Sequence, residues 1–272
     1  MAVAVGVSAA LLWLIATQVD VHRVSAVLGA ADARLIAAAV VAALFVNLPL
    51  SALSLERALA AHGVKLSLGA ALGATVGHLA LHAGGTAVVG KAARALYLSK
   101  AHGVEAAPAV RAEVTLLVLK LVALLVLAAA GAALARAWWS APCLVLVLGA
   151  LVAWGERRGA RAAALSGAFA CALAMGMGQL VVFTLALRSL DVTLPAIQVL
   201  WLFPLCLVGA KLPVSLMGLG VREALVLLMF RGSVPAEALL GATLLFSLTE
   251  QVLPGLLGLG FSPRFVARTL RG

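Results

Sequence analysis

The chain has 272 residues; 64% of them are hydrophobic, only 11% are charged, and the mean hydropathy is +1.16. Soluble domains are about half apolar and about a quarter charged, so this composition excludes an ordinary soluble domain. Because a membrane-spanning helix needs about 20 apolar residues, the apolar content is enough for roughly eight crossings. The apolar runs are continuous rather than alternating, which excludes an outer-membrane barrel. The composition predicts an all-α polytopic membrane protein that forms a single transmembrane domain over 1–272.

The formal net charge is +10, which would indicate a nucleic-acid partner in a soluble chain. In membrane proteins, Lys and Arg collect in cytoplasmic loops, so we expect no nucleic-acid partner. Cys143, Cys171 and Cys206 lie inside apolar runs without paired spacing, so no disulfide framework, metal site or cofactor is expected. The chain opens on an apolar run with no basic start, and we expect no cleaved signal peptide.

The apolar segments in chain order cover about 1–17, 35–55, 66–100, 109–135, 138–154, 162–187, 194–231 and 236–260. Two of them, 66–100 and 194–231, are too long for one crossing and are interrupted by Gly-rich or Pro-rich stretches. The sequence therefore predicts about six full spans and two broken re-entrant helical hairpins, or eight or more spans if each hairpin is two crossings. The residues assigned to the hairpin breaks are Gly84, Gly85, Gly90, Ser215, Gly218 and Gly220.

Loop charges indicate the orientation. The 156–161 loop and the C-terminal tail are rich in Arg, which is typical of cytoplasmic segments. The 18–34 and 188–193 loops carry balanced charges and are expected outside. This pattern predicts a multi-pass protein of the bacterial inner membrane with both termini in the cytoplasm. The first hairpin then opens to the cytoplasm and the second to the outside.

The spacing of these segments predicts an internal repeat. A span, a broken segment and a second span follow one another over about 35–135 and again over about 162–260, in opposite orientations. Inverted repeats with paired broken helices are typical of transporters, whose substrate sites lie at the repeat interface. Non-helical backbone at membrane depth is tolerated only where it is buried or lines a cavity. Glycine-mediated helix packing, for which Gly69, Gly73 and Gly77 form a suitable stripe, is the alternative explanation.

Cationic residues gather around the two breaks: Lys91 and Arg94 near the first, and Lys211 and Arg222, with Glu223 beside it, near the second. Cations near the starts of half-helices favour an anion site, and a phosphate-bearing lipid head group fits this chemistry. We therefore expect these five residues to bind substrate. The alternative is that the basic side chains extend to the membrane interface.

Ionisable residues also occur inside the predicted spans, where they are costly and usually functional. Lys120 and Glu250 lie near the centres of equivalent spans and are expected to pair at mid-membrane, for coupling or as a purely structural ion pair. His82 shares a helix face with His78 and is a candidate for a proton role, with ordinary packing as the alternative. No further ligands for zinc are nearby. Glu113, at the start of its span, is expected at the interface.

Lys211 to Ala224 reads KLPVSLMGLGVREA, followed by VPAEA at 234–238 and PGLLG at 254–258. This pattern resembles the lysylphosphatidylglycerol synthase transmembrane-region family of flippase-like membrane proteins, and RALYL at 94–98 resembles its first-half counterpart. Three departures are Leu216-Met217, where the family has Pro-Gly, Lys91, where it usually has Glu, and the last span, which lacks the usual basic residue and has Ser247 and Glu250 nearby instead. The resemblance covers the membrane part only, so it does not imply the aminoacyl-transferase activity of members that carry a further soluble domain.

The resemblance implies a lipid transporter or flippase that moves a phospholipid, a polyprenyl-linked lipid or another amphiphile such as a hopanoid. The expected partner is a membrane lipid with an anionic head group; a homo-oligomer or a lipid-synthesis enzyme partner stays open. One alternative is a non-transporting accessory membrane subunit of a lipid or glycan synthesis enzyme. Another is a lipid-modifying enzyme that uses Glu250. We expect no enzyme, because the sequence contains no phosphate loop and no nucleophile elbow.

Overall fold

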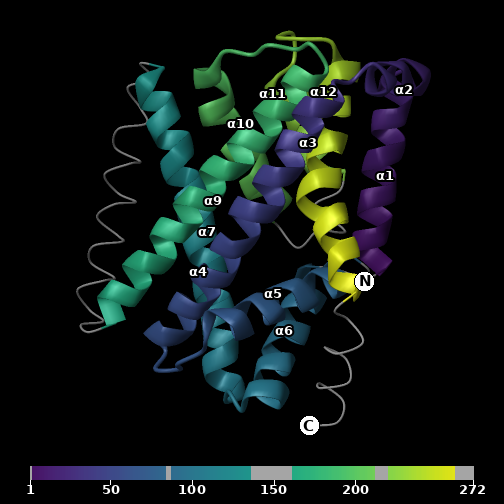
Figure 1. Ribbon diagram of the computed structural model, residues 1–272. Coiled ribbons are helices and arrows are strands. Elements are labelled where there is room, and N and C mark those ends of the chain that lie inside the picture. Colours follow the sequence, from purple (N-terminus) through teal and green to yellow (C-terminus); the bar gives the residue numbers. More distant parts are fainter. Residues whose placement is uncertain (1, 84–86, 136–160, 212–219, 261–272) are drawn as a thin grey trace.

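The structure is a computed structural model that describes residues 2–83, 87–135, 161–211 and 220–260 (Figure 1). Every regular element in these ranges is a helix, as the composition predicts. The elements are α1 (Ala2–Gln18), α2 (Val21–Gly29), α3 (Ala33–Ala42), η1 (Ala43–Asn47), α4 (Leu48–Ala61), α5 (Leu68–Ala83), α6 (Ala87–His102), α7 (Ala106–Leu134), α9 (Ala162–Ser189), α10 (Ala196–Ala210), α11 (Val221–Met229), α12 (Ala236–Ser247) and η3 (Leu248–Val252).

Four helices among the described residues are long and apolar enough to cross a membrane: Ala33–Ala61, Ala106–Leu134, Ala162–Ser189 and Ala236–Gly260. The first and last continue through the π-helical turns η1 and η3. The protein is therefore a multi-pass helical membrane protein. The predicted span at 138–154 lies outside the described residues.

The two interrupted segments each form a pair of short helices, α5 with α6 and α10 with α11. The longest of these helices has 16 residues. At 1.5 Å per residue it is about 24 Å long, shorter than the roughly 30 Å hydrocarbon core. In Figure 1 the α5–α6 pair is connected to its neighbours at the lower end of the bundle and the α10–α11 pair at the upper end. This geometry favours two opposed hairpins over two crossings per segment.

The element order is the same in the two ranges that the sequence marks as repeats. Each contains a long helix, a hairpin and a second long helix: α3–η1–α4, α5–α6 and α7 in one, and α9, α10–α11 and α12–η3 in the other. The two hairpins enter the bundle from opposite ends, as an inverted arrangement requires (Figure 1). Equivalence of the two units in detail stays a prediction.

Aromatic side chains hold the second hairpin in the bundle. Phe183 of α9 stacks on Phe203 of α10 with ring centroids 3.8 Å apart, and the edge of Phe246 of α12 meets both rings. Phe230, just after α11, joins the same buried cluster. The first hairpin packs in a separate cluster of mostly small and aliphatic residues that includes Leu55, Leu98 and the ring of Tyr97. Each hairpin is thus fixed by its own apolar contacts.

The glycine stripe on α5 does not mediate close helix contact at two of its positions. A Cβ atom added at Gly69 or Gly73 would meet nothing within 4 Å, so the packing prediction is wrong there. The close approach occurs instead at Gly131 of α7, where a Cβ would lie 2.8 Å from the backbone nitrogen of Trp201. Glycine at 131 therefore allows α7 to pack against α10.

Candidate functional site

A cavity of about 230 Å³ lies where the two hairpins meet the long helices. Residues of α5, α6 and α7 line it together with residues of α9, α10, α11 and η3, so both halves of the chain contribute. Its lining is unusually rich in charge for a membrane helix bundle. The charged lining residues are Lys91, Arg94, Glu113, Lys120, Lys211, Arg222 and Glu250.

Arg222 lies in the first turn of α11 and lines this cavity. Gly220, which precedes the helix, has a φ of +84°, a conformation that residues with a Cβ rarely adopt. Its backbone N–H donates to Oε2 of Glu223 at 2.7 Å, so a carboxylate in the first turn satisfies one of the donors left open at the helix start. This local geometry sets Arg222 and Glu223 side by side.

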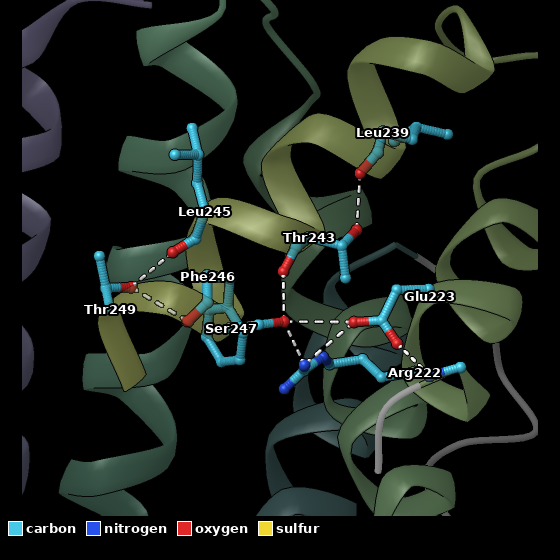
Figure 2. A network of polar contacts seen from close by, with 9 residues as sticks. Arg222, Glu223, Leu239, Thr243, Leu245, Phe246, Ser247 and Thr249 are labelled. Atoms are coloured by element: carbon cyan, nitrogen blue, oxygen red, sulfur yellow. Dashed lines mark hydrogen bonds and ion pairs between the residues drawn. The ribbon is translucent and has the colours of Figure 1, made fainter. Parts of the chain in front are cut away.

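Arg222 and Glu223 form a fully buried polar network with Ser247 of α12 (Figure 2). Arg222 Nη2 donates to Glu223 Oε1 at 3.0 Å and to the hydroxyl of Ser247. Ser247 Oγ in turn lies 3.2 Å from Glu223 Oε1 and 2.7 Å from the carbonyl oxygen of Thr243. The guanidinium also lies over the ring of Phe246, 5.1 Å from its centroid. The network therefore joins the second hairpin to α12.

Arg94 of α6 makes the corresponding contact for the first hairpin. Its Nε and Nη2 donate to the two carboxylate oxygens of Glu113, at 2.5 and 2.6 Å. The side chains are 4% and 8% exposed, so Glu113 is buried between helices, while its expected position at the membrane interface stays a prediction. The physical reason for the burial is that a buried guanidinium needs a bidentate carboxylate partner, and α7 supplies it.

Each hairpin thus contributes an arginine to a buried Arg–Glu ion pair. In each, the second short helix carries an arginine that lines the cavity and is neutralised by a buried carboxylate. In the first hairpin the carboxylate comes from the neighbouring span, and in the second it is the next residue along the chain. Both arginines lie in the predicted site, and each already has a counter-charge.

The three lysines of the cavity lack such partners. Among the described residues, Lys91, Lys120 and Lys211 form no ion pair or hydrogen bond, although all three are partly buried. The charges around Lys120 are Lys211, Arg94, Glu113 and Lys91, and most of these are also positive. Three cationic residues from α6, α7 and the end of α10 therefore line the same cavity.

Glu250 is bound by amides. Asn47 Nδ2 donates to Glu250 Oε1 at 2.5 Å and Gln179 Nε2 approaches Oε2 at 3.5 Å. Its charged neighbours are Lys211 and Arg222, so the described contacts do not pair it with Lys120, although both residues line the cavity. The carboxylate contacts instead the two amides that η1 and α9 present.

Asn47, Gln179 and Ser247 are site residues that the sequence interpretation missed. All three are polar side chains inside long apolar runs, which is the signal that could have identified them. Asn47 reaches Glu250 because α9 has glycine at 178: a Cβ at that position would overlap the Asn47 amide.

The cavity brings together six of the residues predicted from sequence, with Glu223 packed behind Arg222. Gly90 is buried in α6, and Gly220 caps α11. Gly84, Gly85, Ser215, Gly218 and the side chain of His82 lie outside the described residues. Within the described part of the chain, no three His, Cys, Asp or Glu residues are placed to hold a metal ion.

The fold and cavity define a multi-pass helical membrane protein with a charged site between two opposed hairpins. Residues 1–156 and 154–258 match the family described as lysylphosphatidylglycerol synthase TM region, and the chain belongs to this family. Membership connects this membrane protein with lipid metabolism. A comparison with curated proteins finds no match.

Proposed function

We propose that this protein is a lipid transporter that moves a lipid with an anionic head group from one leaflet of the membrane to the other. The observation that carries the proposal is the cavity between the hairpins, in which Lys91, Lys120 and Lys211 form no ion pair with any described residue. Family membership supports a lipid as the substrate.

The charges favour an anionic ligand. Unpaired ammonium groups in a membrane interior are costly, and repulsion among them adds to that cost. A ligand that brings negative charge between Lys120 and Lys211 removes both penalties. The arginines contribute positive potential to the site, while their carboxylate partners fix them in position.

Helix α7 has one apolar face and one charged face, which match the acyl chains and the head group of a lipid. Val110, Val114 and Val118 are exposed and recur every four residues, so they form one apolar stripe along the helix. Glu113 and Lys120 line the cavity from another face of the same helix. A head group bound in the cavity can therefore leave its acyl chains along apolar helix surface.

The opposed hairpins provide a mechanism. Inverted repeats with broken helices are typical of carriers in which one part rocks against another around a central site. In this account the α5–α6 hairpin controls access from the cytoplasm and the α10–α11 hairpin controls access from outside. The protein then lies in the inner membrane with both termini in the cytoplasm.

The proposal is tested in lipid vesicles that contain the purified protein and fluorescent phosphatidylglycerol. A membrane-impermeant reductant bleaches label in the outer leaflet, and continued bleaching reports movement of lipid from the inner leaflet. We expect movement with wild type, its loss in Lys120→Gln/Lys211→Gln, and its retention in the exposed control Lys65→Gln/Lys100→Gln. Equal movement in wild type and the Lys120/Lys211 variant contradicts the proposal.

The same preparation separates the alternatives. A wild type that moves no anionic lipid, but copurifies stably with a synthase, favours the accessory subunit. A covalently altered lipid made by the purified protein favours the enzyme that uses Glu250.

A further inference from the structure

The charges of the cavity do not balance. The described residues of its lining include five cationic side chains, Lys91, Arg94, Lys120, Lys211 and Arg222. Glu113 and Glu223 each neutralise one arginine, and Glu250 is the remaining carboxylate. Residues 84–86 and 212–219 of the sequence include no charged residue. With every group in its usual ionised form, the described residues of the site keep a net charge of two positive units.

The hydrogen-bond donors of the three lysines belong to one cavity. Lys91 comes from α6, Lys120 from α7 and Lys211 from the end of α10, so donors from both hairpins and one long helix surround the same space. Arg222 also lines the cavity, and its buried Nε has no hydrogen-bond partner among the described residues. Buried polar groups in native proteins are rarely left unsatisfied, so an open donor beside unpaired lysines indicates a ligand with several acceptor oxygens.

Phosphate esters differ in what they present to such a site. A phosphodiester head group carries one negative charge and two unesterified oxygens. A phosphomonoester carries close to two charges and has three unesterified acceptor oxygens, and a diphosphate offers at least as much charge. Only the latter two groups match both the net charge and the number of donors.

Building on the proposed lipid transport, we propose that this cavity selects a lipid whose head group is a phosphomonoester or a diphosphate, in preference to a phosphodiester lipid. Lys91, Lys120, Lys211 and Arg222 Nε bind the terminal oxygens. The Arg94–Glu113 and Arg222–Glu223 pairs keep the two hairpins in place around them.

The test measures binding to the purified full-length protein in a neutral detergent at pH 8. The probes are dioctanoyl phosphatidic acid and dioctanoyl phosphatidylglycerol, which share acyl chains and differ in ester type, and farnesyl diphosphate. We expect phosphatidic acid or farnesyl diphosphate to bind about tenfold or more tightly than phosphatidylglycerol, because additional charge-assisted hydrogen bonds form. Whichever of these two binds more tightly identifies the monoester or the diphosphate as the preferred group.

The variants assign the preference to the lysines. In Lys120→Gln and in Lys211→Gln the advantage over phosphatidylglycerol should fall to near unity, while Lys65→Gln/Lys100→Gln keeps it. Melting temperatures measured in parallel identify any variant that loses its fold, and Lys91→Gln then replaces it. Equal affinity for all three probes, or a preference that survives in the folded lysine variants, overturns the inference.

Failure of this inference can be told apart from failure of the proposed function. If phosphatidylglycerol binds as tightly as phosphatidic acid and wild type still moves it across vesicles, only the selectivity is wrong. If no anionic lipid binds and none moves, the transport proposal fails as well.

Discussion

Arg94 and Glu113 connect the first hairpin to α7 through two parallel hydrogen bonds of 2.5 and 2.6 Å. Both side chains are almost completely buried, so this contact lies in the interior of the helix bundle. A bidentate pair fixes the orientation of both partners. The pair therefore positions α6, and with it Lys91, at the edge of the cavity.

Glu113→Gln should destabilise the protein strongly. Removing one partner of a buried ion pair leaves an uncompensated charge and typically costs about 3–5 kcal/mol. Thermal melting of the purified protein measures the loss, and Glu105→Gln, an exposed site just before α7, is the matched control. The double variant Arg94→Gln/Glu113→Gln should melt above Glu113→Gln alone. Identical melting of Glu113→Gln and Glu105→Gln would show that the pair does not hold the hairpin.

Ser247→Ala should weaken the attachment of the second hairpin. The variant loses the hydroxyl that accepts from Arg222, and hydrogen bonds to charged groups contribute about 1.5–3 kcal/mol. The expected result is a lower melting temperature than wild type. Ser166→Ala removes an exposed hydroxyl from α9 and should melt like wild type. A wild-type melting temperature for Ser247→Ala would contradict the role given to the network.

Gly178→Ala should be destabilising, although alanine is usually the better helix former. Its methyl group would overlap the Asn47 amide that binds Glu250, and such overpacking typically costs about 1–3 kcal/mol. Gly73→Ala in α5 is the control, because its methyl group meets nothing within 4 Å and should be neutral or stabilising in a thermal melt. Equal melting of the two variants would count against close packing at Gly178.

The orientation can be measured by cysteine labelling of intact cells. In a background without the native cysteines, Thr193→Cys probes the connection from α9 to α10, and Lys65→Cys probes the connection from α4 to α5. Figure 1 places these connections at opposite ends of the bundle. A membrane-impermeant thiol reagent should label Thr193→Cys directly and Lys65→Cys only after permeabilisation. The reverse pattern would invert the proposed topology.

Much of the fold could be predicted from the sequence because hydropathy and segment length are local properties. The interrupted runs 66–100 and 194–231 do contain pairs of short helices, and the uninterrupted runs 109–135 and 162–187 form the long helices α7 and α9. The π-helical turns η1 and η3, which contain Asn47 and Glu250, were not predicted, because hydropathy does not distinguish a π-helical from an α-helical turn.

The site was harder to predict, because its contacts depend on helix rotation and on partners distant in sequence. Lys120 and Glu250 both line the cavity, yet the carboxylate turns toward Asn47 and Gln179, which an inspection of charged residues alone overlooks. Position within a span also does not determine burial. Glu113 lies near the start of its span, yet its side chain is buried, where it forms an ion pair with Arg94 of another helix.

The central claim is that the cavity between the hairpins binds an anionic lipid. Mass spectrometry of the lipids that copurify with the protein tests it most directly, with wild type compared with Lys91→Gln/Lys120→Gln/Lys211→Gln and with the exposed control Lys65→Gln/Lys100→Gln. We predict that an anionic lipid is enriched over its share in the membrane in wild type and in the control, and is lost in the triple variant. The same bulk-like lipid composition in all three proteins would contradict the claim.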